Sequence, residues 1–253
     1  PYVVFEKKES EGVANSYNCP IVSSYSVLIK SQMSVYDNSE VKIDNPVFTF
    51  KDKKLLLKNC ETYIKTLCKE YKELKYSSAQ VKNAVNKGLE AQSKFEKDMQ
   101  AKAEEYFEKA KANNIPIILL AARPYHTDSL IQHKLSDIIS SLGACVISDD
   151  IVRLNNDFDM QDTYMLSQWT YMNRIVKAAK WVCEQNDEVN YAQITSFGCG
   201  PDAFLLDEIT NLLKRHNKSC TIIKVDDINN VGSMRVRIRS LLESLEQKSN
   251  KQK

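Results

Sequence analysis

Short apolar runs alternate with amphipathic helical patterns through the C-terminal half of the chain. The apolar runs, rich in β-branched residues and leucine, cover 115–122, 144–148, 190–196 and 220–225. Apolar residues recur at helical spacing over 129–143, 163–186, 201–217 and 231–248. Continuous apolar strands separated by helices are typical of a parallel sheet with both faces covered. The pattern predicts an α/β domain over 115–247.

The N-terminal half shows a different organisation, with few strand patterns and much helix. We interpret "PYVVFE" (1–6) and "CPIVSS" (19–24) as strands, and we expect helices over 25–33 and 53–74. The stretch 78–112 has no proline and a single glycine, which predicts one helix about 50 Å long. We therefore expect a partial N-terminal α/β lobe over 1–75, a helical connector over 76–114 and a disordered tail over 248–253.

Composition narrows the class of protein. The 253 residues are 43% apolar and 27% charged with a net charge of +2, as in ordinary globular proteins. No basic stretch suggests a nucleic-acid partner, and no apolar run is long enough to span a membrane. Seven cysteines, an odd number without any C-x-x-C, argue against a disulfide framework and predict a cytoplasmic protein. The chain starts at Pro1, and we interpret it as a fragment of a longer protein.

Polar, proline and glycine residues follow the predicted strands of the C-terminal half. The four segments are "RPYHTD" (123–128), "SDD" (148–150), "SFGCGPD" (196–202) and "DDINN" (226–230). In an open parallel sheet, ligands bind at the carboxyl ends of the strands. Arg123, held extended by Pro124, is a candidate for binding a carboxylate or phosphate. The other binding candidates are Tyr125, His126, Ser196, Gly198, Gly200 and Asp226.

Cys199 lies between Gly198 and Gly200, directly before a predicted helix. The glycines allow close approach to the sulfur, and the helix N-terminus favours a thiolate. From the residues alone, three interpretations stay open: a metal-cluster ligand, a nucleophile paired with His126, and a buried turn residue. Cys19 is in a similar sequence context, because Pro20 follows it directly. We expect the other five cysteines to pack in the core.

Four stretches carry a family resemblance. They are "LLAARPYHTDSLIQHKLSDIISSLGACVISDDIV", "WTYMNRIVKAA", "QITSFGCGPDAFLLDEI" and "IIKVDDINNVGSMRVRIRSLLESL", with a thinner match in "YNCPIVSSY". The sequence resembles the 2-hydroxyglutaryl-CoA dehydratase D-component superfamily. More narrowly, it is similar to an uncharacterised domain of large proteins that also carry the acyl-CoA dehydratase activase ATPase. The resemblance is dense over 115–247.

This resemblance implies a Rossmann-like α/β fold and an iron–sulfur module for ATP-driven radical dehydration or reduction of (2-hydroxy)acyl-CoA thioesters. It implies a [4Fe–4S] cluster with Cys19 and Cys199 as two ligands, and it places a third cysteine upstream of Pro1. The implied partners are the activase ATPase domain and an acyl-CoA. Two alternatives stand beside it: a docking or regulatory domain for the activase that has lost its cluster, and a domain that binds CoA or phosphate through "RPYH" and "DDINN".

Overall fold

The computed structural model describes residues 1–36, 42–155, 158–160, 168–186, 188–196, 198–225 and 232–251. Two sheets, both parallel, organise these residues. The N-terminal elements are β1 (Tyr2–Val3), α1 (Pro20–Tyr36), β2 (Val47–Phe48), α2 (Lys53–Glu70) and α3 (Ser78–Ala112). The C-terminal elements are β3 (Ile117–Ala121), η1 (Pro124–Thr127), α4 (Leu135–Ser141), β4 (Cys145–Ser148), η2 (Asp149–Val152), α5 (Thr170–Glu184), β5 (Val189–Thr195), α6 (Gly200–Arg215), β6 (Cys220–Lys224) and α7 (Gly232–Lys251), where η marks a 3-10 helix.

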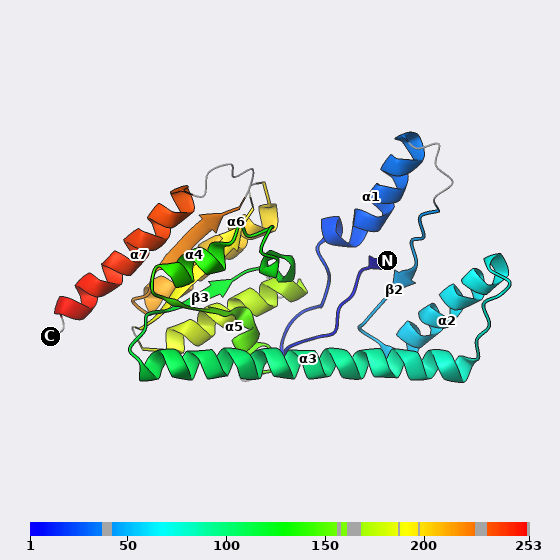
Figure 1. Ribbon diagram of the computed structural model, residues 1–253, viewed down its shortest axis with the longest axis horizontal. Coiled ribbons are helices and arrows are strands. Elements are labelled where there is room, and N and C mark those ends of the chain that lie inside the picture. Colours follow the sequence, from blue (N-terminus) through cyan, green and yellow to red (C-terminus); the bar gives the residue numbers. More distant parts are fainter. Residues whose placement is uncertain are drawn as a thin grey trace.

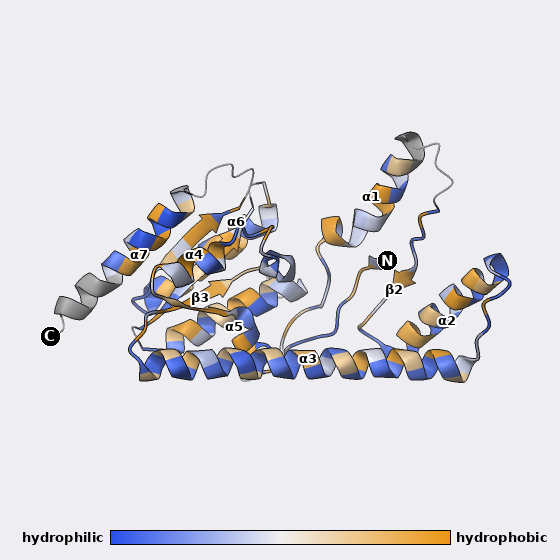
Figure 2. Cartoon of the chain, in the orientation of Figure 1, coloured by the Kyte–Doolittle hydropathy of each residue, from blue (hydrophilic) through white to orange (hydrophobic). Residues whose placement is uncertain are grey.

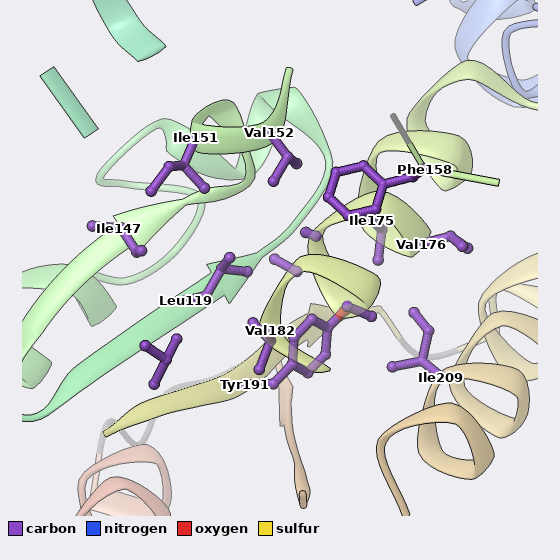
Figure 3. Close-up of a cluster of buried hydrophobic side chains, with 14 of the residues drawn as sticks. Leu119, Ile147, Ile151, Val152, Phe158, Ile175, Val176, Val182, Tyr191 and Ile209 are labelled. Carbon is purple, nitrogen blue, oxygen red and sulfur yellow. The ribbon is translucent and has the colours of Figure 1, made fainter. Parts of the chain in front are cut away.

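The larger sheet has the strand order β4-β3-β5-β6, and all its neighbouring strands are parallel. Alternate side chains of β3 point into two separate hydrophobic cores. Ile117 and Leu119 point into a core formed with α3, α5 and α6, part of which Figure 3 shows around Leu119. Ile118 and Leu120 point into the opposite core, which α4 and α7 complete. The prediction of a parallel sheet covered on both faces is confirmed.

Helix α3 is a single unbroken helix of 35 residues, within the range predicted for the connector. A capping box begins it: the Ser77 side chain accepts from the Gln80 backbone N–H, and the Gln80 side chain accepts from the Ser77 N–H. Its C-terminal part is buried against the larger sheet through Phe107 and Ala110. Its other half packs against α2, so that α3 connects the two lobes seen in Figure 1.

The N-terminal lobe contains less strand than the sequence pattern predicts. In "PYVVFE" only Tyr2 and Val3 form a strand, which pairs with β2. The expectation of a strand at "CPIVSS" is wrong, because α1 begins at Pro20. Proline is tolerated in the first helical turn, and the Ser23 N–H donates to the Cys19 carbonyl at 3.0 Å, closing that turn.

The helix predicted over 129–143 is also shorter than expected. The Asp128 carboxylate accepts from the N–H groups of Leu130 and Ile131, forming a turn that competes with helix. His133 and Lys134 then adopt positive φ angles of 53° and 55°, so that α4 starts only at Leu135. At the other end of the chain, α7 continues to Lys251, into the segment that we expected to be a disordered tail.

None of the helices in the described ranges has the length and apolar character needed to cross a lipid bilayer.

Candidate functional site

The chain brings Arg123 and Cys199 together where the strand order of the larger sheet reverses. From β3 the chain passes to β4 on one side, and then returns to β5 on the other side of β3. The ends of β3 and β5 therefore flank a topological switch point, the usual position of ligands in open α/β sheets. Arg123 follows β3 by two residues, and Cys199 caps α6 shortly after β5.

Arg123 is the centre of a small polar network. Its Nη2 donates to the Cys199 Sγ at 2.9 Å, and its Nη1 donates to the Tyr125 hydroxyl at 2.8 Å. The same guanidinium forms an ion pair with Asp202, which is almost fully buried. The Thr195 hydroxyl, at the end of β5, donates to the other Asp202 oxygen at 2.8 Å. Arg123 is therefore held against the sulfur by partners on both sides.

The backbone around Cys199 explains how the sulfur reaches this position. Gly198 has a φ of +78°, which favours glycine, whereas Gly200 is the first residue of α6. A Cβ added at either glycine would meet no atom within 4 Å among the described residues. Ser196 takes part as a positioning residue, since its N–H donates to the Asp202 carboxylate at 3.4 Å.

The N-terminal segment brings Cys19 to the same site. Tyr17 forms a parallel bridge with Trp169, in which the Tyr17 N–H donates to the Gln168 carbonyl at 3.0 Å. This bridge attaches the N-terminal segment to the start of α5. Cys19 and Cys199 then line one small cavity of about 20 Å³. The other lining residues are Tyr17, Arg123, Trp169, Tyr171, Met172 and Pro201.

Three positive groups surround these two thiols. Each cysteine lies directly before a helix, α1 or α6, whose first turn contains a proline. Unpaired N–H groups and the helix dipole make such positions favourable for an anion. The Arg123 guanidinium adds a full charge at hydrogen-bonding distance from Cys199. Two helix N-termini and one guanidinium thus place positive electrostatic potential around the two sulfur atoms.

His126 lies beside this site but takes a structural role. It is only 3% exposed, and its Nδ1 accepts from the Arg123 backbone N–H at 3.4 Å. Burial, with the nearby Arg123 charge, lowers its pKa to about 4. Among the described residues no hydrogen bond joins His126 to Cys199. The arrangement therefore does not support the interpretation of Cys199 as a nucleophile activated by His126.

The other candidate residues lie away from this site or outside the described residues. Asp226, with the segment "DDINN", lies outside the described residues. Asp149 and Asp150, which follow β4, line a different and larger cleft. Arg123 is already engaged by three protein groups, so a phosphate would have to displace one of them.

Sequence reasoning missed Asp202 and Trp169 as members of the site. Asp202 was visible as an acidic residue at the start of a helix, which is a common capping position and gives no hint of its pairing with Arg123. Trp169 lies next to aromatic residues in the sequence, a pattern more typical of core packing. Only the bridge to Tyr17 places it beside the two thiols.

The side chains available here as metal ligands can be compared with those that a [4Fe–4S] cluster, implied by the sequence resemblance, requires. Protein [4Fe–4S] clusters are held by several cysteine thiolates, usually Cys₄. The described ranges contain no group of three or more cysteine, histidine, aspartate or glutamate side chains placed to bind a metal ion. The cavity between Cys19 and Cys199 has room for about one water molecule. These residues provide two thiols, and the described residues do not form a complete cluster site.

Fold and site together define an α/β domain with a thiol-lined cavity at the switch point of a parallel sheet. The chain belongs to the family of the CoA enzyme activase uncharacterised domain (DUF2229), whose sequence model matches residues 1–152. No curated protein and no solved structure matches the chain. Membership confirms the narrower resemblance, an uncharacterised domain associated with CoA enzyme activases. The matched range includes Cys19 and Arg123 but ends before Cys199, whereas the motifs predict the densest resemblance over 115–247.

Proposed function

We propose that this activase-associated domain supplies Cys19 and Cys199 as two thiolate ligands of an iron–sulfur cluster, whose other ligands come from outside the described residues. The supporting observation is that two cysteines far apart in the sequence, Cys19 and Cys199, line one cavity. Such a cluster would provide low-potential electrons for ATP-driven radical dehydration or reduction of (2-hydroxy)acyl-CoA thioesters, as the sequence resemblance implies.

The protein's own residues would position and tune the two sulfurs. The N-termini of α1 and α6 stabilise negative charge on Cys19 and Cys199. The hydrogen bond from Arg123 would hold the Cys199 Sγ in position, and hydrogen bonds to ligating sulfurs are one of the factors that set the reduction potential of a cluster. Asp202 and Tyr125 fix the guanidinium in the orientation that this bond requires.

Iron content of the natural full-length polypeptide, purified and reconstituted without oxygen, tests this proposal. We expect Cys199→Ser and Cys19→Ser each to lose most of the bound iron and acid-labile sulfide. Cys183→Ser is the matched control, because Cys183 lies near the end of α5, packs against the core and should leave the iron content unchanged. A Cys199→Ser protein that keeps the full iron and sulfide content would disprove the proposal.

A second candidate function is a docking domain for the activase ATPase that binds no cluster. The specific observation is the surface of α1, where Figure 2 shows hydrophobic residues on a helix that projects from the rest of the molecule. Its exposed large apolar side chains include Ile21, Tyr25, Val27, Leu28 and Ile29. Exposed apolar patches of this kind are typical of protein interaction sites.

Binding to the purified activase ATPase domain separates the two candidates. Docking predicts a stable complex that Leu28→Glu weakens at least tenfold, together with no iron in the anaerobic wild-type protein. The variant Val236→Glu, on the exposed surface of α7, serves as the control for added charge. A full complement of iron, or no effect of Leu28→Glu, would exclude docking through α1 as the sole function.

A further inference from the structure

Helix α1 exposes a row of apolar side chains to solvent, which we call the α1 stripe. The α1 stripe consists of Ile21, Tyr25, Leu28, Ile29 and Met33. Their spacing places them on one face of the helix, and each side chain is between 42% and 57% exposed. Figure 1 shows α1 projecting from the rest of the molecule. The only charged residue in the sequence of α1 is Lys30, whose position lies away from this face, so the stripe itself carries no charge.

A second exposed surface is a large cleft between the two lobes, separate from the thiol cavity. It encloses about 1310 Å³ and is lined by the N-terminal segment, β2, α2, α3 and the start of α5. Figure 1 shows α3 running along both α2 and α5, with the N-terminal segment reaching α3 between them. We call this space the interlobe cleft. A helix about 10 Å across fills such a volume with roughly three turns, so the cleft is large enough to hold a segment of helix.

One wall of the interlobe cleft is apolar and accessible. It includes Phe48, Phe50, Val85, Leu89, Phe95 and Met99. Phe95 is 53% exposed and Phe50 is 39% exposed, so this wall can be contacted from outside. On α3 the wall extends from Val85 to Met99, about 21 Å along the helix axis, and the α1 stripe extends for about 18 Å. The two apolar surfaces therefore have similar lengths.

Gly88 lies within this wall, in the interior of α3. A glycine inside a helix makes the helix less stable than alanine would. A Cβ added at Gly88 would meet no described atom within 4 Å, so packing among the described residues does not require a glycine here. The missing side chain leaves room for the close approach of a second helix. This position thus lowers the stability of α3 and suits a docked helix.

Most charged residues of the interlobe cleft form ion pairs at its floor or stay in contact with solvent. Arg174 binds Glu9 through two bonds of 2.6 and 3.0 Å, and Arg153 lies 3.1 Å from Glu96 on α3. The exposed charged side chains of the N-terminal segment are Lys7, Lys8 and Glu11. A helix that enters along α3 therefore contacts mainly the apolar wall. An uncharged stripe suits this contact, because no charge has to be buried without a partner.

The size of the exposed apolar surface favours a reciprocal contact between two copies of the chain. Side chains of this kind offer roughly 200 Å² each, so the half-exposed α1 stripe supplies about 500 Å². With an equal area of the cleft, one contact would bury about 1,000 Å², below the size of most stable interfaces, whereas two contacts bury about 2,000 Å², as in permanent dimers. A two-fold axis produces both contacts at once and leaves neither surface exposed.

We propose that two copies of this chain form a two-fold symmetric dimer, in which the α1 stripe of each copy lies in the interlobe cleft of the other against Val85, Gly88 and Phe95. An apolar helix face in an apolar groove is a common mode of recognition. The dimer does not depend on the proposed cluster, because it uses neither Cys19 nor Cys199. It also gives α1 a different partner from the activase, which is absent from the experiment below.

Sedimentation equilibrium of the purified chain over a range of concentrations tests this proposal. We expect a dimer whose dissociation constant rises at least tenfold in Ile29→Glu and in Gly88→Leu. Leucine is a better helix former than glycine, so Gly88→Leu should keep or raise the thermal unfolding temperature while it blocks the cleft. Lys30→Glu and Ala91→Leu are the matched controls, because they change exposed positions of α1 and α3 outside the two surfaces and should leave the dissociation constant unchanged.

A mixture of the two disruptive variants examines the reciprocal arrangement. Ile29→Glu keeps an intact cleft and Gly88→Leu keeps an intact α1 stripe, so one of the two contacts is unaltered in a mixed dimer. The mixture should therefore contain more dimer than either variant alone at the same total concentration. A monomeric wild-type chain, an unchanged dissociation constant in Ile29→Glu or Gly88→Leu, or no gain of dimer on mixing would overturn the proposal.

Discussion

The Nη2 atom of Arg123 lies 2.9 Å from the Sγ of Cys199, joining two residues 76 positions apart in the chain. The same guanidinium pairs with the buried carboxylate of Asp202. Since β3 and β5 are neighbours in the sheet, their carboxyl ends bring these residues together without any contribution from the N-terminal lobe. The Arg123 side of the site is therefore a property of the larger sheet, whereas Cys19 is added to it by the bridge between Tyr17 and Trp169.

Replacing Arg123 with alanine should be costly, because it leaves the Asp202 carboxylate buried without its cation. We expect the free energy of unfolding to fall by about 3–5 kcal/mol, as measured by urea denaturation. Arg215→Ala, which removes a largely exposed ion pair with Glu208, should change stability by less than about 1 kcal/mol. Similar effects of the two substitutions would contradict this assignment.

Asp149 should make the protein less stable as the pH rises. Its folded-state pKa of about 7 lies above the unfolded value, so between about pH 4 and 7 the folded state binds the extra proton. Stability from this group is greatest below pH 4 and declines by up to roughly 1.4 kcal/mol per pH unit until pH 7. Urea unfolding of wild type and Asp149→Asn across this range isolates the effect, and a constant difference between the two proteins would refute it.

His126 should have the opposite dependence on pH. Its folded-state pKa of about 4 lies below the unfolded value near 6.5, so here the unfolded state binds the extra proton. Stability from the neutral imidazole is complete above about pH 6.5 and falls as the pH drops toward 4. The measurement is the titration of the His126 ring by NMR, with His126→Gln to assign the signal. A ring that titrates at an ordinary histidine pKa would show that the buried neutral state is absent.

The two glycines beside Cys199 should respond differently to alanine. Gly198→Ala forces a β-carbon into the left-handed region and should cost about 1–2 kcal/mol, because the strain is in the backbone alone. Gly200→Ala lies in the first turn of α6 with no neighbour within 4 Å, and should be neutral or stabilising by up to about 1 kcal/mol. Thermal unfolding of both variants measures the contrast. Equal destabilisation would mean that Gly200 has a role beyond its conformation.

Much of the C-terminal domain could be predicted because its strands are buried on both faces. The unbroken apolar run at Ile117–Ala121 identifies a central strand, and Ala103 and Ala110 belong to a stripe that identifies a covering helix. The capping pair Ser77 and Gln80 similarly marks the start of α3. In these places local preference and tertiary packing favour the same structure.

Prediction failed where short segments had a local alternative to the regular pattern. The Asp128 turn ended the predicted helix at 129–134, although Leu130 and Ile131 fit a helical face, because a side-chain hydrogen bond satisfied the backbone first. At "CPIVSS", β-branched residues suggested a strand. The segment instead begins α1 at Pro20, where helix satisfies the backbone groups internally.

The sequence by itself determined the order of strands and helices in the C-terminal half, the parallel sheet, and the placement of Arg123 and Cys199 at strand ends, because these follow from hydrophobic periodicity and from the geometry of parallel connections. Only the tertiary structure decided that Cys19 meets Cys199, that Asp202 holds Arg123, and that Asp149 lies in a charge network with Glu9 and Arg174. These contacts join segments far apart in the chain. Their energies depend on burial and distance, which no local pattern of residues records.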